Sequence, residues 1–266
     1  TSDWDQGRAL GAALAAECAG FGFHLDFAPV LDVWSNPDNT VIGKRAFGSD
    51  WKVVSGFGAA VSNALQAAGV IPVVKHFPGH GDTVVDSHMG LPVVDKSLED
   101  LSLQELPPFR DLISGGETPS GRAEAVPAVM VAHILMTQLD PDLPASLSPA
   151  VVTDLLRGEL GFGGVVFTDD LTMGAITQNY GLGEAAVLAV EAGCDMLLVC
   201  HGRDSVDAAR SALLEAAASG RISQARLDES VRRILSLKLE YGVSGEPVSA
   251  PDLNALNALV DAVAAQ

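Results

Sequence analysis

The segment VIPVVKHF, residues 70–77, decides the fold class, because it is apolar along its length until a lysine and a histidine near its end. A strand with one solvated face alternates between apolar and polar residues, whereas a parallel strand covered on both faces is continuously apolar. Four further runs have the same character: HLDFAPVLDV at 24–33, AVMVAHILM at 128–136, GVVFTDDL at 164–171 and CDMLLVC at 194–200. The sequence therefore predicts a parallel sheet.

The stretches between the apolar runs carry the start and stop signals of helices. Ser97-Leu-Glu-Asp100 resembles a capping box and predicts one helix start, and Ser148 before Pro149 predicts another. Glycine readily adopts the left-handed conformation that closes a helix, and it ends four of the stretches. These stretches begin near residues 50, 148, 184 and 204 and end at Gly69, Gly161, Gly193 and Gly220. Alternating strands and helices predict βα units.

Polar residues gather at the C-terminal ends of the predicted strands. They are Asp32, Lys75, His76, His133, Asp169 and Asp170. Side chains that face one mouth from several strand ends are typical of a (β/α)8 TIM-type barrel, whereas an open doubly wound sheet concentrates them at one switch point. The sequence contains no G-x-G-x-x-G and no P-loop pattern. We therefore predict an α/β barrel in which residues 1–266 form a single domain.

The beginning of the chain does not fit a complete barrel. Five strands are recognisable in the sequence, and a barrel of this type has eight. The chain opens on a predicted helix at residues 3–19, although a βα barrel begins with a strand. We therefore expect one or two further strands upstream of Thr1.

Composition limits the compartment and the classes of partner. The 266 residues fit one barrel domain of about 250 residues. A net charge of −18 disfavours nucleic acid and anionic membranes as partners, and no apolar stretch approaches the ~20 residues of a membrane span. Three cysteines (Cys18, Cys194 and Cys200) are too few for a disulfide framework and favour a reducing compartment. We expect a cytoplasmic monomer, unless a leader upstream of Thr1 directs secretion or a lipoprotein anchor.

The densest cluster of titratable residues is KHFPGHGDTVVDSHMGLP, residues 75–92. Its six titratable side chains are too many for a loop with only a structural role. The spacings His-x3-His-x-Asp and Asp-x-His fit a metal site, in which imidazoles and carboxylates are the ligands. They fit acid/base catalysis equally well, with Asp86 orienting the His88 imidazole for proton transfer near neutral pH. The residues alone leave both interpretations open.

A second candidate site is FTDDLTM, residues 167–173. Asp169 emerges from a predicted buried strand, so it is a candidate nucleophile that faces the mouth of the barrel. A carboxylate in such a place can attack an anomeric carbon and form a glycosyl-enzyme intermediate, which water then hydrolyses. Asp170 is suited to capping the turn that follows.

Together these motifs resemble glycoside hydrolase family three. The resemblance is carried by KHFPGHGDTVVDSH at 75–88 and FTDDLTMGAI at 167–176, preceded by FAPVLDVWSNPDNTVIGKRAFG at 27–48. Within the family the chain most resembles the bacterial β-N-acetylglucosaminidase branch, which trims cell-wall muropeptides. The resemblance implies a catalytic barrel with its site at the C-terminal mouth. It also implies that no metal and no cofactor are used, which decides against the zinc interpretation.

The same resemblance implies an activity and a set of roles. The activity is that of a retaining exo-β-N-acetylglucosaminidase in peptidoglycan recycling, acting on a small carbohydrate such as a muropeptide or a chitooligosaccharide. Asp169 corresponds to the nucleophile, and His88, paired with Asp86, corresponds to the acid/base. The residues assigned to the sugar pocket are Arg45, Lys75, His76 and His133, with Asp32, which we expect to orient neighbours such as Arg45.

The sequence departs from the family's pattern in one respect. The acidic D-Q-E-G-G-R segment of the family, whose aspartate binds sugar hydroxyls, is absent from residues 1–266, and we expect it upstream of Thr1. Within the family, the alternatives are a β-glucosidase or β-xylosidase, and a phosphorylase in which phosphate intercepts the same intermediate. A catalytically inactive sugar-binding barrel is the alternative from another class.

Replacing His88 with alanine is expected to slow substrates with poor leaving groups far more than activated aryl glycosides. A poor leaving group needs the proton that a protonated imidazole donates, whereas an activated one departs without it. Steady-state kinetics on a disaccharide and on an aryl glycoside measure the difference. Equal losses on both substrates would contradict the acid/base role of His88.

Overall fold

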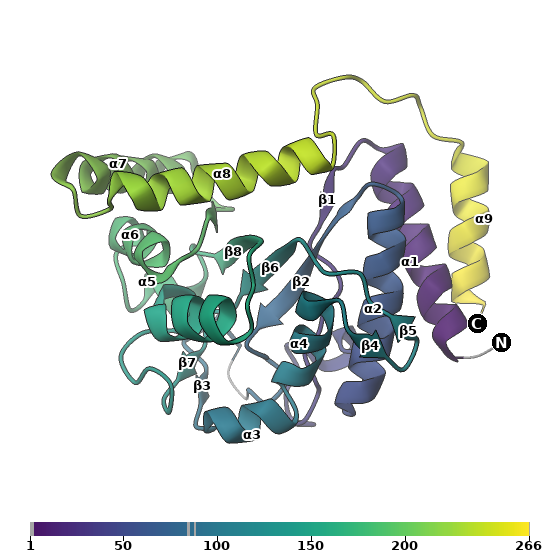
Figure 1. Cartoon of the computed structure of the whole chain (residues 1–266), viewed down its shortest axis with the longest axis horizontal. Coiled ribbons are helices and arrows are strands. Elements are labelled where there is room, and N and C mark those ends of the chain that lie inside the picture. The colour runs from purple at the N-terminus through teal and green to yellow at the C-terminus, as the bar shows by residue number, and fades with distance from the viewer. Residues whose placement is uncertain (1–2, 84–85, 88, 266) are drawn as a thin grey trace.

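The computed structural model describes residues 3–83, 86–87 and 89–265. At its centre lies a parallel sheet of five strands (Figure 1). In spatial order these are β1 (Leu25–Asp26), β2 (Ile71–Phe77), β6 (Ala128–Val131), β8 (Val165–Asp170) and β9 (Met196–Leu198). Each strand pairs in parallel with the next, so the order along the chain is also the order across the sheet.

This sheet confirms the predicted α/β class with a parallel sheet. Each of the five apolar runs contributes one of the strands. Among the described residues β1 and β9 are the edges, so these strands form an open sheet and not a closed barrel. A sheet that adds each new strand beside the last one, in parallel, has the connectivity of a barrel wall.

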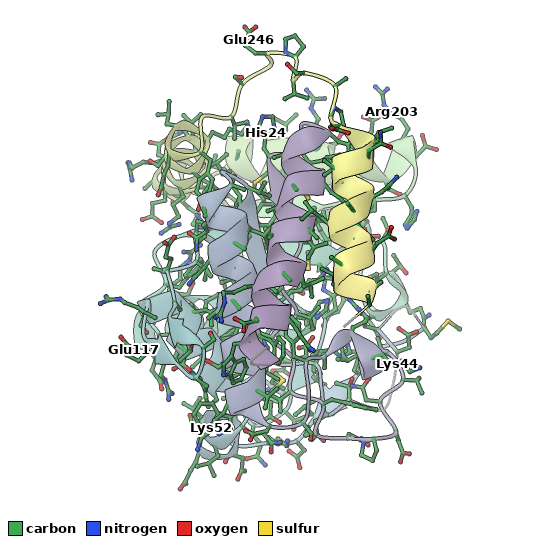
Figure 2. The ribbon with its side chains drawn as sticks, turned by 90° about the vertical axis from the view of Figure 1, so that its right-hand side faces the viewer. His24, Lys44, Lys52, Glu117, Arg203 and Glu246 are labelled. Carbon is green, nitrogen blue, oxygen red and sulfur yellow. The ribbon has the colours of Figure 1, made fainter. Side chains whose placement is uncertain are left out.

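Helices and short turns connect the strands. The helices are α1 (Asp3–Gly20), α2 (Trp51–Ala67), α3 (Leu98–Leu103), α4 (Leu106–Ser114), the π-helix η3 (Ala150–Glu159), α5 (Gly174–Thr177), α6 (Leu182–Ala192), α7 (Arg203–Ser219), α8 (Gln224–Glu240) and α9 (Leu253–Ala264). The remaining short elements are the 3-10 turns η1 (Gly43–Arg45) and η2 (Ala145–Leu147), and the paired strands β3 (Val93–Val94) with β7 (Leu135–Met136) and β4 (Glu117–Thr118) with β5 (Gly121–Arg122). Figure 2 shows α1 standing between α2 and α9. In the part of the chain that the structure covers, no helix is both long enough and apolar enough to cross a membrane.

The helix signals in the sequence are confirmed by local hydrogen bonds. Ser97 accepts a hydrogen bond from the amide of Asp100, whose carboxylate accepts one from the amide of Ser97, which completes the capping box. The Ser148 hydroxyl accepts from the amide of Val151 at 3.3 Å and caps η3. Gly193 closes α6 with a φ of 117°, in the left-handed region that disfavours a side chain.

The strands are apolar throughout because both of their faces are covered. Residues on one face of β2, β6 and β8, such as Val74, Val129 and Val166, pack in a core cluster with residues of α2, α4, η3 and α6. Residues on the opposite face, such as Val73 and Phe167, pack in a second cluster that includes Leu237 of α8. This arrangement is the double coverage that continuous apolar runs indicate.

The stripe of leucine and valine residues at 227–239 in α8 is a pattern that predicts core packing, and this prediction is wrong for part of the stripe. Leu237 is buried, with 7% of its surface exposed, but Val231, Leu235 and Leu239 are 52%, 53% and 82% exposed. The physical reason is that α8 packs on the sheet through the side that carries Leu237, and the other side of the helix is left exposed. An apolar groove of about 580 Å³ lies between α7 and α8, beside β9.

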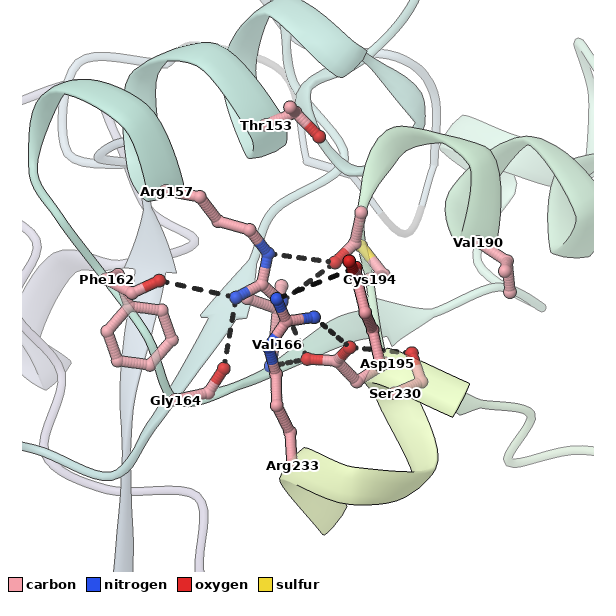
Figure 3. Close-up of polar contacts among 12 residues, drawn as sticks. Thr153, Arg157, Phe162, Gly164, Val166, Val190, Cys194, Asp195, Ser230 and Arg233 are labelled. Atoms are coloured by element: carbon pink, nitrogen blue, oxygen red, sulfur yellow. Dashed lines mark hydrogen bonds and ion pairs between the residues drawn. The ribbon is translucent and has the colours of Figure 1, made fainter. Parts of the chain in front are cut away.

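A buried carboxylate joins four elements at the end of the sheet opposite the polar strand ends (Figure 3). The side chain of Asp195, just before β9, is fully buried. Its oxygens accept from Arg157 of η3 at 2.6 Å and from Arg233 of α8 at 3.1 Å. They also accept from the Ser230 hydroxyl at 2.7 Å and from the amide of Val166 in β8 at 3.0 Å. One carboxylate therefore ties η3, α8, β8 and β9 together.

Replacing Asp195 with alanine should lower the free energy of unfolding by about 3 kcal/mol or more, because a broken buried ion pair leaves its partners unpaired. Urea denaturation measures this loss. The matched control is Asp207→Ala, which removes an exposed partner of Arg203 within α7. The control should cost less than about 0.5 kcal/mol. Equal losses in the two variants would contradict the role given to Asp195.

Candidate active site

The polar strand ends surround a pocket at the C-terminal edge of the sheet. Its volume is about 280 Å³, and it is lined mainly by residues at the C-terminal ends of β2, β8 and β9 and in the segments that follow β1, β2 and β9. The predicted site residues that line it are Arg45, Lys75, His76 and Asp169. His80, Ser87 and Cys200 line it as well. The sequence pattern indicated His80 only as a metal ligand and indicated no role for Ser87 or Cys200. Asp32 and His133 are fully buried and lie one layer behind the pocket, against residues that line it.

Asp169 reaches the pocket at the end of β8 as an ionised carboxylate. Burial alone would raise the pKa of Asp169, but the imidazole of His76 and the ammonium group of Lys75 oppose this effect. The amide of Asp170 also donates to the Asp169 carboxylate, at 2.8 Å. Together these groups hold the pKa of Asp169 below its ordinary value. An ionised carboxylate at the wall of a pocket is the form that a nucleophile requires.

The carboxylate of the neighbouring Asp170 has a structural role, because it accepts hydrogen bonds from two backbone amides and a hydroxyl. Its carboxylate accepts from the amide and hydroxyl of Thr172, at 3.0 and 2.6 Å, and from the amide of Cys200, at 3.0 Å. Burial would raise the pKa of Asp170, but these donors hold it below its ordinary value. Asp170 therefore caps the turn after β8 and joins it to the chain after β9, and this leaves Asp169 as the aspartate of the pair that is suited to reaction.

Asp32 organises the residues that follow β2. Its side chain has no exposed surface, and it accepts hydrogen bonds from the amide of His80 at 2.7 Å and the amide of His76 at 3.3 Å. It also accepts from Nδ1 of His76 at 2.7 Å, which leaves Nε2 of that ring facing Arg45 Nη2 at 3.4 Å. Asp32 thus orients His76 and His80, and it reaches Arg45 only through His76.

His133 is held by two hydrogen bonds inside the protein. Its Nε2 lies 3.0 Å from the carbonyl oxygen of Asp170, and a carbonyl accepts, so Nε2 carries the proton. Its Nδ1 accepts from the Ser146 hydroxyl at 2.7 Å. Burial lowers the pKa of His133 and keeps the ring neutral. This geometry places His133 behind Asp169, where it fixes the adjoining backbone at Asp170.

The glycines of the segment KHFPGHGD allow the loop to pack tightly. Gly79 has a φ of 129°, and a side chain there would press on Glu105 at 2.8 Å. A Cβ on Gly81 would overlap the carbonyl oxygen of Val33. Lys96 then pairs with Asp82 at 2.9 Å and with the buried Glu105 at 2.7 Å. The loop is therefore fixed against the segment that follows β1 and against the start of α4.

The predicted acid/base pair, Asp86 and His88, follows this loop in the sequence. His88 falls outside the described residues, so its pairing with Asp86 remains a prediction. The carbonyl of Asp86 accepts from the amides of Met89 and Gly90, at 2.8 and 3.0 Å, which forms a turn. Ser87, between the two predicted catalytic residues in the sequence, is 2% exposed.

Three of the groups that the sequence offered as metal ligands have other partners. His76 contacts Asp32, the His80 ring contacts Thr83 and Ser87, and Asp82 contacts Lys96. Across residues 3–83, 86–87 and 89–265, no three histidine, cysteine or acidic side chains are grouped so as to hold a metal ion.

A parallel sheet with an ionised carboxylate and basic side chains at its C-terminal edge is the layout of an α/β enzyme. The sequence model described as "Glycosyl hydrolase family 3 N terminal domain" matches residues 1–237, and the chain belongs to this family.

Similar proteins carry related names. The chain is 40% identical over 188 residues to a "Beta-hexosaminidase" of Stenotrophomonas maltophilia (strain R551-3), covering 71% of this chain and 52% of that protein. It is 41% identical over 223 residues to "Beta-hexosaminidase LpqI" of Mycobacterium bovis (strain BCG / Pasteur 1173P2), covering 82% of this chain and 54% of that protein. The chain thus spans about half the length of these curated relatives.

The chain is also similar to a solved structure of a member of the same family. It is described as a glycoside hydrolase family 3 β-N-acetylglucosaminidase from Paenibacillus sp. str. FPU-7. The two structures superpose with a TM-score of 0.90 at 43% identity, covering 98% of this chain and 49% of that one.

Acidification is expected to destabilise the fold through two buried histidines. Burial lowers the pKa of both His80 and His133, so below about pH 6.5 the unfolded chain binds protons that the folded chain does not. Stability is therefore fully present above this pH and is lost as the pH falls towards the folded-state pKa, by up to about 1.4 kcal/mol per pH unit for each ring.

His133→Gln removes one of these two rings and should flatten the dependence of the unfolding free energy on pH between about 5 and 6.5. Urea denaturation at several pH values measures the slope. His24→Gln, which alters an exposed imidazole, should keep the wild-type slope. An unchanged slope in His133→Gln would show that the buried ring is not held neutral.

Proposed function

We propose that this protein is a retaining exo-β-N-acetylglucosaminidase that removes terminal N-acetylglucosamine from peptidoglycan fragments. The observation that carries the proposal is the ionised, nearly buried Asp169 at the wall of a pocket that also holds Arg45, Lys75 and His76. The names of the relatives support β-N-acetylglucosamine as the sugar.

In the first step, Asp169 attacks the anomeric carbon as the bond to the leaving oxygen breaks. A protonated His88, oriented by Asp86, gives that oxygen its proton. The products are a glycosyl ester on Asp169 and the released aglycone. In the second step, neutral His88 takes a proton from water, the water oxygen attacks the same carbon, and the ester bond breaks. Two inversions give net retention.

A histidine acid/base has an electrostatic rationale. A carboxylic acid in this role becomes negative after it gives up its proton, whereas an imidazolium becomes neutral. Neutral His88 therefore adds no second negative charge beside the carboxylate that departs when the ester is hydrolysed.

The other polar residues are suited to holding the sugar. The ammonium of Lys75, the Nε2 side of His76 and the guanidinium of Arg45 converge on the pocket. They offer donors to sugar hydroxyls close to Asp169. The volume of about 280 Å³ is at the small end for a ligand pocket and fits a single terminal sugar, which favours exo action.

We further propose that the sheet is part of a (β/α)8 barrel and that residues 1–266 act as one catalytic domain. The parallel strand order supports this, and so does the apolar groove beside the edge strand β9. The free cysteines Cys18, Cys194 and Cys200 favour a cytoplasmic location, and the gathering of the proposed site residues on one chain favours a monomer.

Incubation with a 2-fluoro glycosyl donor should leave one sugar attached to Asp169, because the fluorine slows hydrolysis of the intermediate. Mass spectrometry of peptides locates the label. Asp169→Asn should lose the label and lower kcat by roughly a thousand-fold or more. Asp170→Asn is the matched control and should still be labelled. A label on any residue other than Asp169 would overturn the nucleophile assignment.

A further inference from the structure

Ser87 joins the two segments that carry the proposed chemistry. Its hydroxyl lies 3.2 Å from Nε2 of His80, in the loop that follows β2. Its carbonyl oxygen accepts from the amide of Ala175 at 3.0 Å, in α5, a few residues after Asp169. In the sequence Ser87 stands between Asp86 and His88. Its two contacts therefore hold Ser87, the middle residue of the sequence Asp86-Ser87-His88 (here called the D-S-H segment), between the two sides of the pocket.

The His80 side of this connection is rigid. The amide of His80 donates to the buried carboxylate of Asp32 at 2.7 Å, and its ring Nδ1 lies 2.7 Å from the Thr83 hydroxyl. Asn39 donates to the carbonyl of His80 at 2.7 Å and to the Thr83 hydroxyl at 3.3 Å. These side chains all belong to segments that precede the D-S-H segment. His80, Thr83 and Asn39 are at most 2% exposed.

One assignment of protons satisfies every contact in this group. Nδ1–H of His80 donates to the Thr83 hydroxyl, which donates in turn to the carbonyl of His80 at 3.1 Å. Nε2 is then the acceptor, and the Ser87 hydroxyl donates to it. Removal of that hydroxyl would leave a buried ring nitrogen without a partner, which is unfavourable.

A second hydrogen bond, at the C-terminal end of α5, also joins this helix to the loop that contains Ser87. The side-chain amide of Gln178 donates to the carbonyl of Met89 at 2.9 Å. Residues on both sides of position 88 thus contact the segment that follows the nucleophile. A shift of the D-S-H segment relative to Asp169 would break these bonds.

We propose that Ser87 is a positioning residue, which through His80 and α5 fixes the distance between the proposed acid/base unit and the nucleophile. This inference rests on the proposed function, since it gives Asp86 and His88 their role. Proton donation to a leaving group depends steeply on geometry, and a misplacement of about 1 Å can cost roughly a hundred-fold in rate. Without the contacts of Ser87, the nucleophile and the acid/base group would both remain, but the acid/base group would be out of position.

The test is the leaving-group dependence of Ser87→Ala in the full protein. On a GlcNAc disaccharide kcat/KM should fall roughly ten- to a hundred-fold, and on an activated aryl glycoside less than about three-fold. The matched control is Ser62→Ala in α2, a buried serine whose hydroxyl has no hydrogen-bond partner among the described residues. The control should keep the wild-type ratio between the two substrates.

A second pair of variants separates positioning from general destabilisation. In His80→Gln the longer amide reaches the Nε2 position and can retain the Ser87 contact. In His80→Asn the shorter amide reaches only the Nδ1 position, near Thr83. His80→Asn should therefore reproduce the Ser87→Ala ratio, whereas His80→Gln should restore most of the wild-type ratio. Identical ratios in the two variants would overturn the proposal.

Kinetics of His88→Ala on the same two substrates separate a failure of the Ser87 proposal from a failure of the proposed function. If His88→Ala and Ser87→Ala both lose activity selectively on the disaccharide, the positioning role is supported. If only His88→Ala does so, the proposal for Ser87 fails and the proposed function stands. Equal losses on both substrates in Ser87→Ala would mean that it contacts the sugar instead. Equal losses in His88→Ala would overturn the acid/base assignment and the inference built on it.

Discussion

A carboxylate without access to water persists only where its oxygens receive hydrogen bonds, and Asp32 imposes this condition on the site. Three donors meet it: the amides of His76 and His80 and the ring of His76. The backbone after β2 must fold around Asp32 to bring these donors together. That fold sets Lys75 and His76 at the pocket wall and starts the loop at His80, which leads on to Thr83 and Ser87. The arrangement around the pocket therefore depends on one buried charge that does not itself line it.

Environment separates the two adjacent aspartates at the end of β8. The carboxylate of Asp170 is taken up by the amides of Thr172 and Cys200, so it serves the turn. Asp169 accepts a hydrogen bond from the amide of Asp170 and lies near the imidazole of His76 and the ammonium group of Lys75, which keep its carboxylate ionised. A carboxylate with few hydrogen bonds and a low pKa is both charged and available. Of these two adjacent aspartates, one therefore stabilises a turn and the other remains available at the pocket.

The sequence predicted the structural features that depend on residues close together in the chain. Apolar runs covered on both faces gave the strands, and Ser97 with Asp100 gave a capping box, because each pattern depends on residues close together in the chain. The exposed part of α8 was mispredicted, because periodicity identifies an apolar face but not what lies against it. The placement of His133 behind Asp169 depends on Ser146 and Asp170, which are distant in sequence, so spacing did not reveal it. Ser87 went unnoticed for the same reason, since a serine in a loop carries no signal until the fold brings His80 and Ala175 to it.

The central claim is that Asp169 forms a covalent bond to the sugar. Its most direct test is the configuration of the first product, followed by proton NMR of the anomeric signal during hydrolysis of a β-linked N-acetylglucosaminide. Two successive displacements at the anomeric carbon predict that the β-anomer appears first and converts slowly to the equilibrium mixture. If the α-anomer appeared first, water would have attacked the sugar directly, and the role given to Asp169 would be wrong.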